Sequence, residues 1–418
     1  MGFSNNGYSK WPGIIVNIII FVFITILTYL ILQKILSNEE KSKEKSIILT
    51  LATAITMASL TNVIYIRMYA LSTLNIMLTT YLHMKLLESE KINPKLLILI
   101  GISATIGSLT HYYYLFYLAM MYIIFAIKYI RKKEWKKFGF YTLTMAIAAV
   151  ISLLIFPYSI VHMFFGYRGQ GVIDKFKQIA MFFDNIKNYL GKVNRFCFNG
   201  IGFGILVLEI CAYIYLKIKK CKIECNKYMK KIIPPTIFYF LLVAVASPWI
   251  ELRYIMPICS LIFIIGIYFA YILLKNIFSE KKTNIIISIM IIAIMISPAI
   301  FKIEPEVMFS DKKEIVEKLS NEYNLPTLYV FYSENNRFLD DILLFSKIDN
   351  SYIAKDFEYS VENIKTIFEG KDTSKGIIVF INKDEGNEKI LEKLGDILNL
   401  KNTKHLKRMN ACNIYYIF

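Results

Sequence analysis

Long apolar stretches alternate with short polar connections over the first 301 residues of the chain. A helix needs about 20 apolar residues to cross the hydrocarbon core of a bilayer, and most of these stretches are that long. The run from Leu96 to Ile127 is polar only near His111, so we interpret it as two short helices. The pattern therefore predicts a mainly α polytopic membrane domain over residues 1–301, with about ten spans. The predicted spans are 13–33, 47–64, 69–87, 96–112, 113–128, 138–158, 198–217, 232–249, 254–275 and 284–301.

Composition agrees with a membrane protein. Hydrophobic residues make up 56% of the 418 residues, against about 45–50% in soluble domains, and the mean hydropathy is +0.47. The formal net charge is +17. Most of this excess lies in every second connection, so membrane topology explains it better than nucleic-acid binding. The six cysteines have no spacing typical of a metal or redox site.

The basic connections predict the orientation. Loops rich in Lys and Arg stay in the cytoplasm, so the connections between them face outward, as do both termini. One outer loop, Ser159–Phe198, is long, and residues 174–183 within it have the spacing of a helix that lies in the membrane interface. The basic segments lie within 33–46, 85–95, 128–137, 217–231 and 275–282.

After Pro298 the sequence becomes more charged and its apolar runs become shorter. Strand-like and helix-like segments alternate there, which predicts a small extracytoplasmic α/β domain over residues 302–418. No glycine-rich phosphate loop follows a predicted strand, so dinucleotide binding is unsupported. The predicted strands are 328–332, 352–354, 376–381 and 413–417, and the predicted helices are 338–348, 361–368 and 385–398.

Polar and aromatic residues concentrate in three outward connections. These contain Arg67 with Tyr69, then His111 with Tyr112, and then Arg253. Each group alone fits an aromatic belt or a snorkelling arginine. Together they place two arginines and one histidine on the same membrane face with few acids. Because arginine offers forked donors to phosphate oxygens, the set predicts a phosphate or pyrophosphate site.

The same stretches resemble a known family. Ile66–Leu71, Leu109–Tyr113, Ser247–Pro248 and Arg253–Pro257 resemble, in order and spacing, segments of GT-C-fold membrane glycosyltransferases. The similarity covers residues 13–300 and is to the bacterial set that resembles protein mannosyltransferases and aminoarabinose transferases. It implies an enzyme of the cell membrane and cell envelope.

The resemblance also implies a reaction. Such an enzyme takes a sugar from a polyprenyl-phosphate donor and gives it to a glycan, lipid or protein acceptor at the outer face. Arg67, His111 and Arg253 would then contact the donor phosphate or its neighbourhood. No cofactor is implied with certainty, and a divalent metal requirement stays open.

One departure from the family leaves the catalytic base unknown. Members typically begin with an additional span and an outer loop that carries an acidic residue, whereas residues 1–12 contain no acid. The outer acids in the membrane portion are Asp174, Asp184 and Glu251, and Glu251 is expected to pair with Arg253.

Two other classes of function therefore remain open. The chain is either a transferase, or an incomplete relative or fragment that acts as a binding protein, or a lipid or sugar transporter. Glu209, inside an apolar stretch, is the residue that a transporter would use.

Overall fold

The computed structural model describes residues 11–165, 181–247, 250–306, 325–331, 351–355, 368–381, 387–409 and 412–418. The chain divides into two compact units. The first, called the helical unit, covers residues 13–307. The second, called the sheet unit, is formed mainly by residues 308–418.

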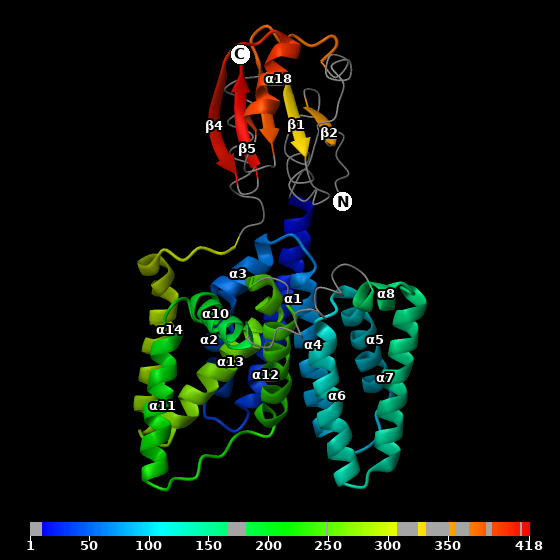
Figure 1. Ribbon diagram of the computed structural model, residues 1–418. Coiled ribbons are helices and arrows are strands. Elements are labelled where there is room, and N and C mark those ends of the chain that lie inside the picture. The colour runs from blue at the N-terminus through cyan, green and yellow to red at the C-terminus, as the bar shows by residue number, and fades with distance from the viewer. Residues whose placement is uncertain are drawn as a thin grey trace. The chain divides into compact units, whose positions relative to one another are not determined.

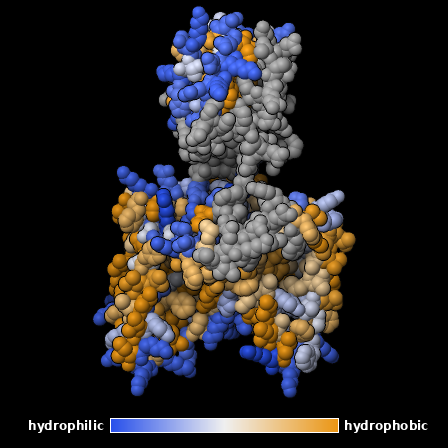
Figure 2. Space-filling model, in the orientation of Figure 1, coloured by the Kyte–Doolittle hydropathy of each residue, from blue (hydrophilic) through white to orange (hydrophobic). Residues whose placement is uncertain are grey.

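Helices make up the helical unit (Figure 1). Their apolar side chains cover its sides, and hydrophilic residues lie at its two ends (Figure 2). The described helices are α1 (Trp11–Ile35), α2 (Ser42–Ala54), α3 (Met57–Ile64), α4 (Tyr69–Glu88), α5 (Pro94–Thr110), α6 (Tyr114–Arg131), α7 (Trp135–Ile155), α8 (Ser159–Phe164), α10 (Phe182–Lys192), the π-helical turn η2 (Val193–Cys197), α11 (Gly202–Ile218), α12 (Met229–Ala246), α13 (Leu252–Lys275) and α14 (Glu280–Phe301).

By length and composition, six of the described helices can cross a membrane, or up to eight if each bent pair is one span. The bent pairs are α2 with α3, at 61°, and α10–η2 with α11, at 103°. The chain is therefore a multi-pass membrane protein, but the predicted count of ten spans is not confirmed. Two predicted spans fail the criterion because α4 is too polar and α5 has only 17 residues.

Several polar residues of α4 are paired inside the bundle. Thr80 shares a 2.7 Å hydrogen bond with the hydroxyl of Tyr117 in α6. His83 is fully buried, and its Nδ1 lies 2.7 Å from the Thr79 carbonyl, which can only accept. Nδ1 therefore carries the proton, and Nε2 accepts from the Tyr141 hydroxyl of α7 at 2.8 Å. Because partners satisfy these groups, a polar helix can pack within an apolar bundle.

Asn199 joins three parts of the helical unit. It is fully buried in the turn between η2 and α11, with φ of 51°. Its Oδ1 accepts from the backbone N–H of Met57 at 2.9 Å, at the start of α3. Its Nδ2 donates to the carbonyl of Ile294 in α14 at 2.9 Å, and Ser297 donates to the Asn199 carbonyl at 2.7 Å. Asparagine tolerates the left-handed conformation better than most residues, so one side chain links both bent pairs and α14.

The connections of the helical unit meet in two groups at opposite ends (Figure 1). Side-chain contacts tie the basic connections to one another. Among them are Lys34 to Glu88 at 2.6 Å, Lys45 to Glu280 at 2.7 Å, Lys275 to Glu39 at 2.5 Å, and Asn226 to the Ile35 carbonyl at 2.8 Å.

The sheet unit has five described strands in the order β2-β1-β3-β5-β4. They are β1 (Thr327–Phe331), β2 (Ser351–Lys355), β3 (Ile377–Ile381), β4 (Thr403–Met409) and β5 (Cys412–Ile417). β1 pairs parallel with β2 and β3, whereas β5 pairs antiparallel with β3 and β4. Helix α18 (Glu388–Leu398) buries Ile390, Leu391 and Leu394 in the same core as β1 and β3.

Four of these strands and α18 confirm predicted elements, with small shifts at their ends. Strand β4 was missed because its sequence, Thr403–Met409, is rich in basic residues. Such a sequence suits an edge strand, where charge discourages pairing with another chain. Three predicted helices lie wholly or mostly outside the described residues. They are 338–348, 361–368 and the interfacial helix 174–183.

We expect Asn199→Ala to destabilise the helical unit by at least about 2 kcal/mol, because it leaves the Met57 N–H and the Ile294 carbonyl without partners. Thermal unfolding in detergent, followed by labelling of the buried Cys197 and Cys259 thiols, measures the loss. Asn276→Ala is the control, since that side chain bonds only within its own helix end and is exposed. Equal midpoints for the two variants would contradict the role of Asn199.

Gly376 should resist substitution in the sheet unit. It has φ of 99°, and an added Cβ would lie 2.3 Å from the Ile417 carbonyl oxygen. Gly370 also has positive φ, 74°, but open space around it. Gly370→Ala should therefore cost only backbone strain, about 1–2 kcal/mol, and Gly376→Ala clearly more. Hydrogen exchange of β3 and β5 in the full chain compares the variants; similar protection in both would refute the steric argument.

Candidate functional site

Six side chains form a closed ring of contacts at the end of the helical unit opposite the basic connections. We call this the arginine–aromatic ring. Its successive ring-centroid distances are 6.0 Å from Tyr65 to Tyr69, 5.3 Å from Tyr69 to His111, 5.0 Å from His111 to Tyr113 and 5.6 Å from Tyr113 to Tyr254. The Arg253 guanidinium lies 5.1 Å from the Tyr254 ring, and its Nη1 donates to the Tyr65 hydroxyl at 3.4 Å.

The turn between α3 and α4 carries the first two members of the ring. Tyr65 follows the last residue of α3, and Tyr69 begins α4. The Tyr65 carbonyl accepts from the backbone N–H of Arg67 at 2.8 Å and from Nδ2 of Asn17 in α1 at 3.1 Å. Two donors on one carbonyl hold this turn, and with it the Tyr65 and Tyr69 rings, against α1.

His111 lies at the C-terminal cap of α5, where its N–H donates to the Gly107 carbonyl at 3.2 Å. Its Nδ1 accepts from the backbone N–H of Tyr113 at 3.1 Å. An Nδ1 that accepts leaves the proton of a neutral imidazole on Nε2. In the neutral ring of His111, the proton is therefore on Nε2.

Arg253 is the second residue of α13, and its side chain is only 11% exposed. Its Nε lies 2.6 Å from Glu251 Oε2, which bears out the expected ion pair, although the Nε–H lacks the geometry of a hydrogen bond. Its bonds to the Tyr65 and Tyr254 hydroxyls are long, 3.4 Å each. A half-buried guanidinium with long bonds to neutral hydroxyls retains donor capacity for a phosphate oxygen.

Glu306 is a functional candidate that sequence reasoning missed. Its backbone N–H donates to the Thr61 hydroxyl of α3 at 3.0 Å, and its Oε1 lies 3.6 Å from Nζ of Lys192 in α10. Burial raises the pKa of its carboxyl group, Lys192 and Arg253 oppose the rise, and Glu251 adds to it. The charges of Lys192, Arg253 and Glu251 therefore all act on the Glu306 carboxylate.

The reason for missing Glu306 is the predicted domain boundary. The change in composition after Pro298 predicts that residues from 302 on belong to the C-terminal domain, which leaves Glu306 outside the predicted membrane portion. Residues 303–306 instead pack on the helical unit: Ile303 is buried in the same core as α13 and α14. The signal available in the sequence was an acidic residue only five positions after the last apolar helix, close enough to lie at the same membrane face.

Two predicted site residues lie outside the ring. Among the described contacts, Arg67 joins it only through its backbone, because its side chain is exposed in the turn before α4. Tyr112 is half-buried between His111 and Tyr113 and has no described contact with the remaining members. Asp184 is exposed in the first turn of α10, and Asp174 lies outside the described residues.

The described residues contain no group of three His, Cys, Asp or Glu side chains that could hold a metal ion. Glu209 lies in α11, and its Oε1 is buried with no hydrogen-bond partner among the described residues by distance and angle. A single carboxyl group in a span does not define a transport path, so the transporter hypothesis stays a prediction.

No protein-family model, no curated protein and no solved structure matches this chain. The resemblance to GT-C glycosyltransferases consequently depends on the sequence motifs alone.

Proposed function

We propose that this chain is a membrane glycosyltransferase that uses a polyprenyl-phosphate sugar as donor and transfers the sugar to an acceptor at the outer membrane face. The observation that carries the proposal is the arginine–aromatic ring, which joins Arg253, Tyr69 and His111 from three separate helices. These are three of the residues that the sequence motifs select for the donor phosphate.

The proposed topology has ten passes. α4 and α5 count as spans in this scheme because most of their polar groups have partners inside the bundle, the buried Ser72 hydroxyl of α4 being an exception among the described residues. The basic connections then face the cytoplasm and the ring faces outward, as the distribution of Lys and Arg requires. The sheet unit, which follows α14, lies outside the cytoplasm in this scheme.

In the proposed chemistry, Arg253 and His111 bind the donor phosphate and Glu306 deprotonates the acceptor. The guanidinium of Arg253 holds the donor phosphate, and Nε2–H of His111 donates to the same group. The Glu306 carboxylate takes the proton of the acceptor hydroxyl as that oxygen attacks the anomeric carbon. The bond from that carbon to the phosphate oxygen breaks, and Arg253 stabilises the negative charge on the leaving polyprenyl phosphate.

Binding of the phosphate can be tested without knowing the sugar. The purified chain should bind a short-chain polyprenyl phosphate more tightly than the corresponding polyprenol, and Arg253→Gln should weaken phosphate binding about tenfold or more, because a charged hydrogen bond is lost. Tryptophan fluorescence or microscale thermophoresis measures both affinities. Arg67→Gln should have a smaller effect, since its side chain is exposed.

Arg195→Gln is the matched control. Arg195 is an exposed arginine of η2 that packs on Phe196, so it reports nonspecific attraction of an anion. Equal affinity for the phosphate and the alcohol, or equal losses from Arg195→Gln and Arg253→Gln, would refute the phosphate site.

Glu306 should matter for transfer and not for donor binding. A base must be ionised, and the pKa of Glu306 is raised, so transfer should decline as pH falls through a value above the ordinary carboxyl pKa of about 4.3. Glu306→Gln should abolish transfer at every pH while phosphate binding persists. Surface-glycan profiling of a deletion strain that carries each variant, with the external pH varied, measures the effect.

Glu304→Gln provides the control two residues away, because Glu304 is exposed. It should retain wild-type transfer. If Glu306→Gln kept transfer while Arg253→Gln lost it, the phosphate site would stand and Glu306 would not be the base.

A further inference from the structure

A cavity lies at the opposite end of the helical unit from the arginine–aromatic ring. Its volume is about 200 Å³, and α1, α2, α13 and α14 line it. Its apolar wall includes Leu32, Leu49, Ile264 and Ile287, one residue from each helix. Ile48, which also lines it, is 49% exposed, so the cavity reaches the apolar side surface that faces lipid.

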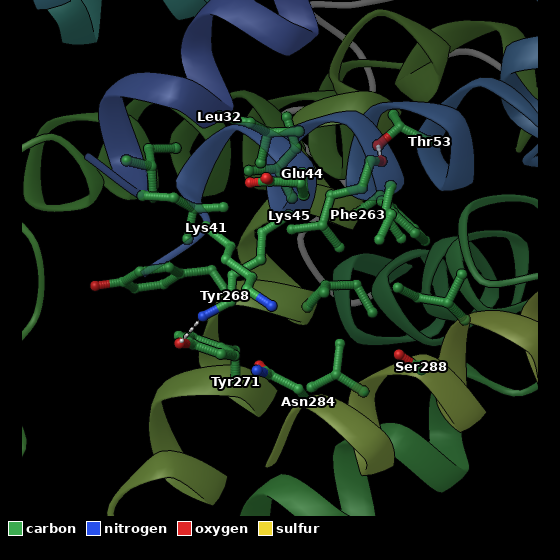
Figure 3. Close-up of a pocket in the computed structure, with 18 residues that line it drawn as sticks. Leu32, Lys41, Glu44, Lys45, Thr53, Phe263, Tyr268, Tyr271, Asn284 and Ser288 are labelled. Carbon is green, nitrogen blue, oxygen red and sulfur yellow. Dashed lines mark hydrogen bonds between the residues drawn. The ribbon is translucent and has the colours of Figure 1, made fainter. Parts of the chain in front are cut away.

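The mouth of this cavity is polar (Figure 3). Lys45 donates to the Tyr271 hydroxyl at 3.0 Å and pairs with Glu280 at 2.7 Å. Polar side chains of α14, among them Asn284, continue the lining. An apolar wall with a polar end matches an amphiphile whose chain lies in the cavity and whose headgroup lies at the mouth.

Two opposite charges line the mouth. Lys41 and Glu44 are both exposed, and neither side chain has an ion pair among the described residues. They are three residues apart at the start of α2, so one headgroup can contact both. The neighbouring charges, Lys45 and Lys275, are already matched by Glu280 and Glu39. Within the described part of the chain, the mouth therefore offers a cation and an anion that have no ion pair.

We propose that this cavity binds a zwitterionic aminophospholipid. Its phosphate would bind Lys41, its primary ammonium would bind Glu44, and part of one acyl chain would fill the apolar wall. The volume is below the roughly 300–1,000 Å³ of small-molecule pockets, so the remaining chain lies outside in the bilayer. An anionic lipid fits less well, because it satisfies Lys41 and brings no cation to Glu44.

The left-handed backbone at Lys41, with φ of 50°, permits a clean substitution. Glycine adopts this conformation without strain, so Lys41→Gly removes the ammonium and keeps the turn. Glu44→Gln removes the carboxylate with little change in shape. Lys43→Ala and Glu40→Gln are the matched controls, because both residues are exposed in the same segment and do not line the cavity.

The full-length chain, purified in detergent, is titrated with phosphatidylethanolamine or with phosphatidylglycerol of the same acyl chains, and native mass spectrometry counts bound lipid. Phosphatidylethanolamine should bind more tightly. Lys41→Gly should weaken it about tenfold or more, as expected for one charged hydrogen bond. Glu44→Gln should weaken it similarly and reduce the preference over phosphatidylglycerol.

A second pair of variants tests the acyl-chain site. Ile48→Trp should block the cavity, whereas Ile47→Trp, at a neighbouring position that is 48% exposed and does not line it, should not. Three outcomes would overturn the proposal. They are tighter binding of phosphatidylglycerol than of phosphatidylethanolamine, no lipid binding at all, and equal effects of each variant and its control. The result is independent of the proposed transferase activity.

Discussion

The helical unit depends on satisfying backbone groups where its helices break. A bilayer core offers no water to an unpaired N–H or carbonyl group, so each break needs a partner from the protein. At the break between α2 and α3, the Thr56 hydroxyl accepts from the Ser59 N–H at 3.3 Å, and Asn199 accepts from the Met57 N–H. Of these two partners, Asn199 is the more distant in sequence, because it lies 142 residues after Met57.

This constraint extends to the candidate site through α3. The helix has only eight residues, yet it carries two groups on which the site depends. The Thr61 hydroxyl holds the backbone of Glu306, and Tyr65 accepts a bond from Arg253 one turn later. A helix this short has little stability of its own. Its position therefore depends on contacts with other parts of the chain, among them the bond from the Met57 N–H to Asn199 and the bond from Asn17 to the Tyr65 carbonyl.

The sequence predicted local features well and long-range ones poorly. Apolar length located the helices, and the alternation of Lys and Arg separated the two groups of connections. Period and composition also located β1, β2, β3, β5 and α18. The sequence did not predict the breaks at Thr56 and Asn199. An asparagine favours a turn, but the sequence does not show which distant backbone groups its side chain will bond. The sequence also missed Glu306. Contacts with residues far away in the chain, such as Thr61, decide which unit Glu306 packs against.

The two arginines that the sequence predicts as phosphate ligands differ in solvent exposure. Both Arg67 and Arg253 lie near Tyr69, but the Arg253 side chain is 11% exposed and Arg67 is exposed. An interaction between charges weakens as the local dielectric constant rises, and exposed pairs are worth about 1 kcal/mol or less. A phosphate held by Arg253 would lose less to water than one held by Arg67. In the proposed phosphate site, Arg253 would therefore be the stronger anchor, and Arg67 would be better suited to attracting an anion than to holding it.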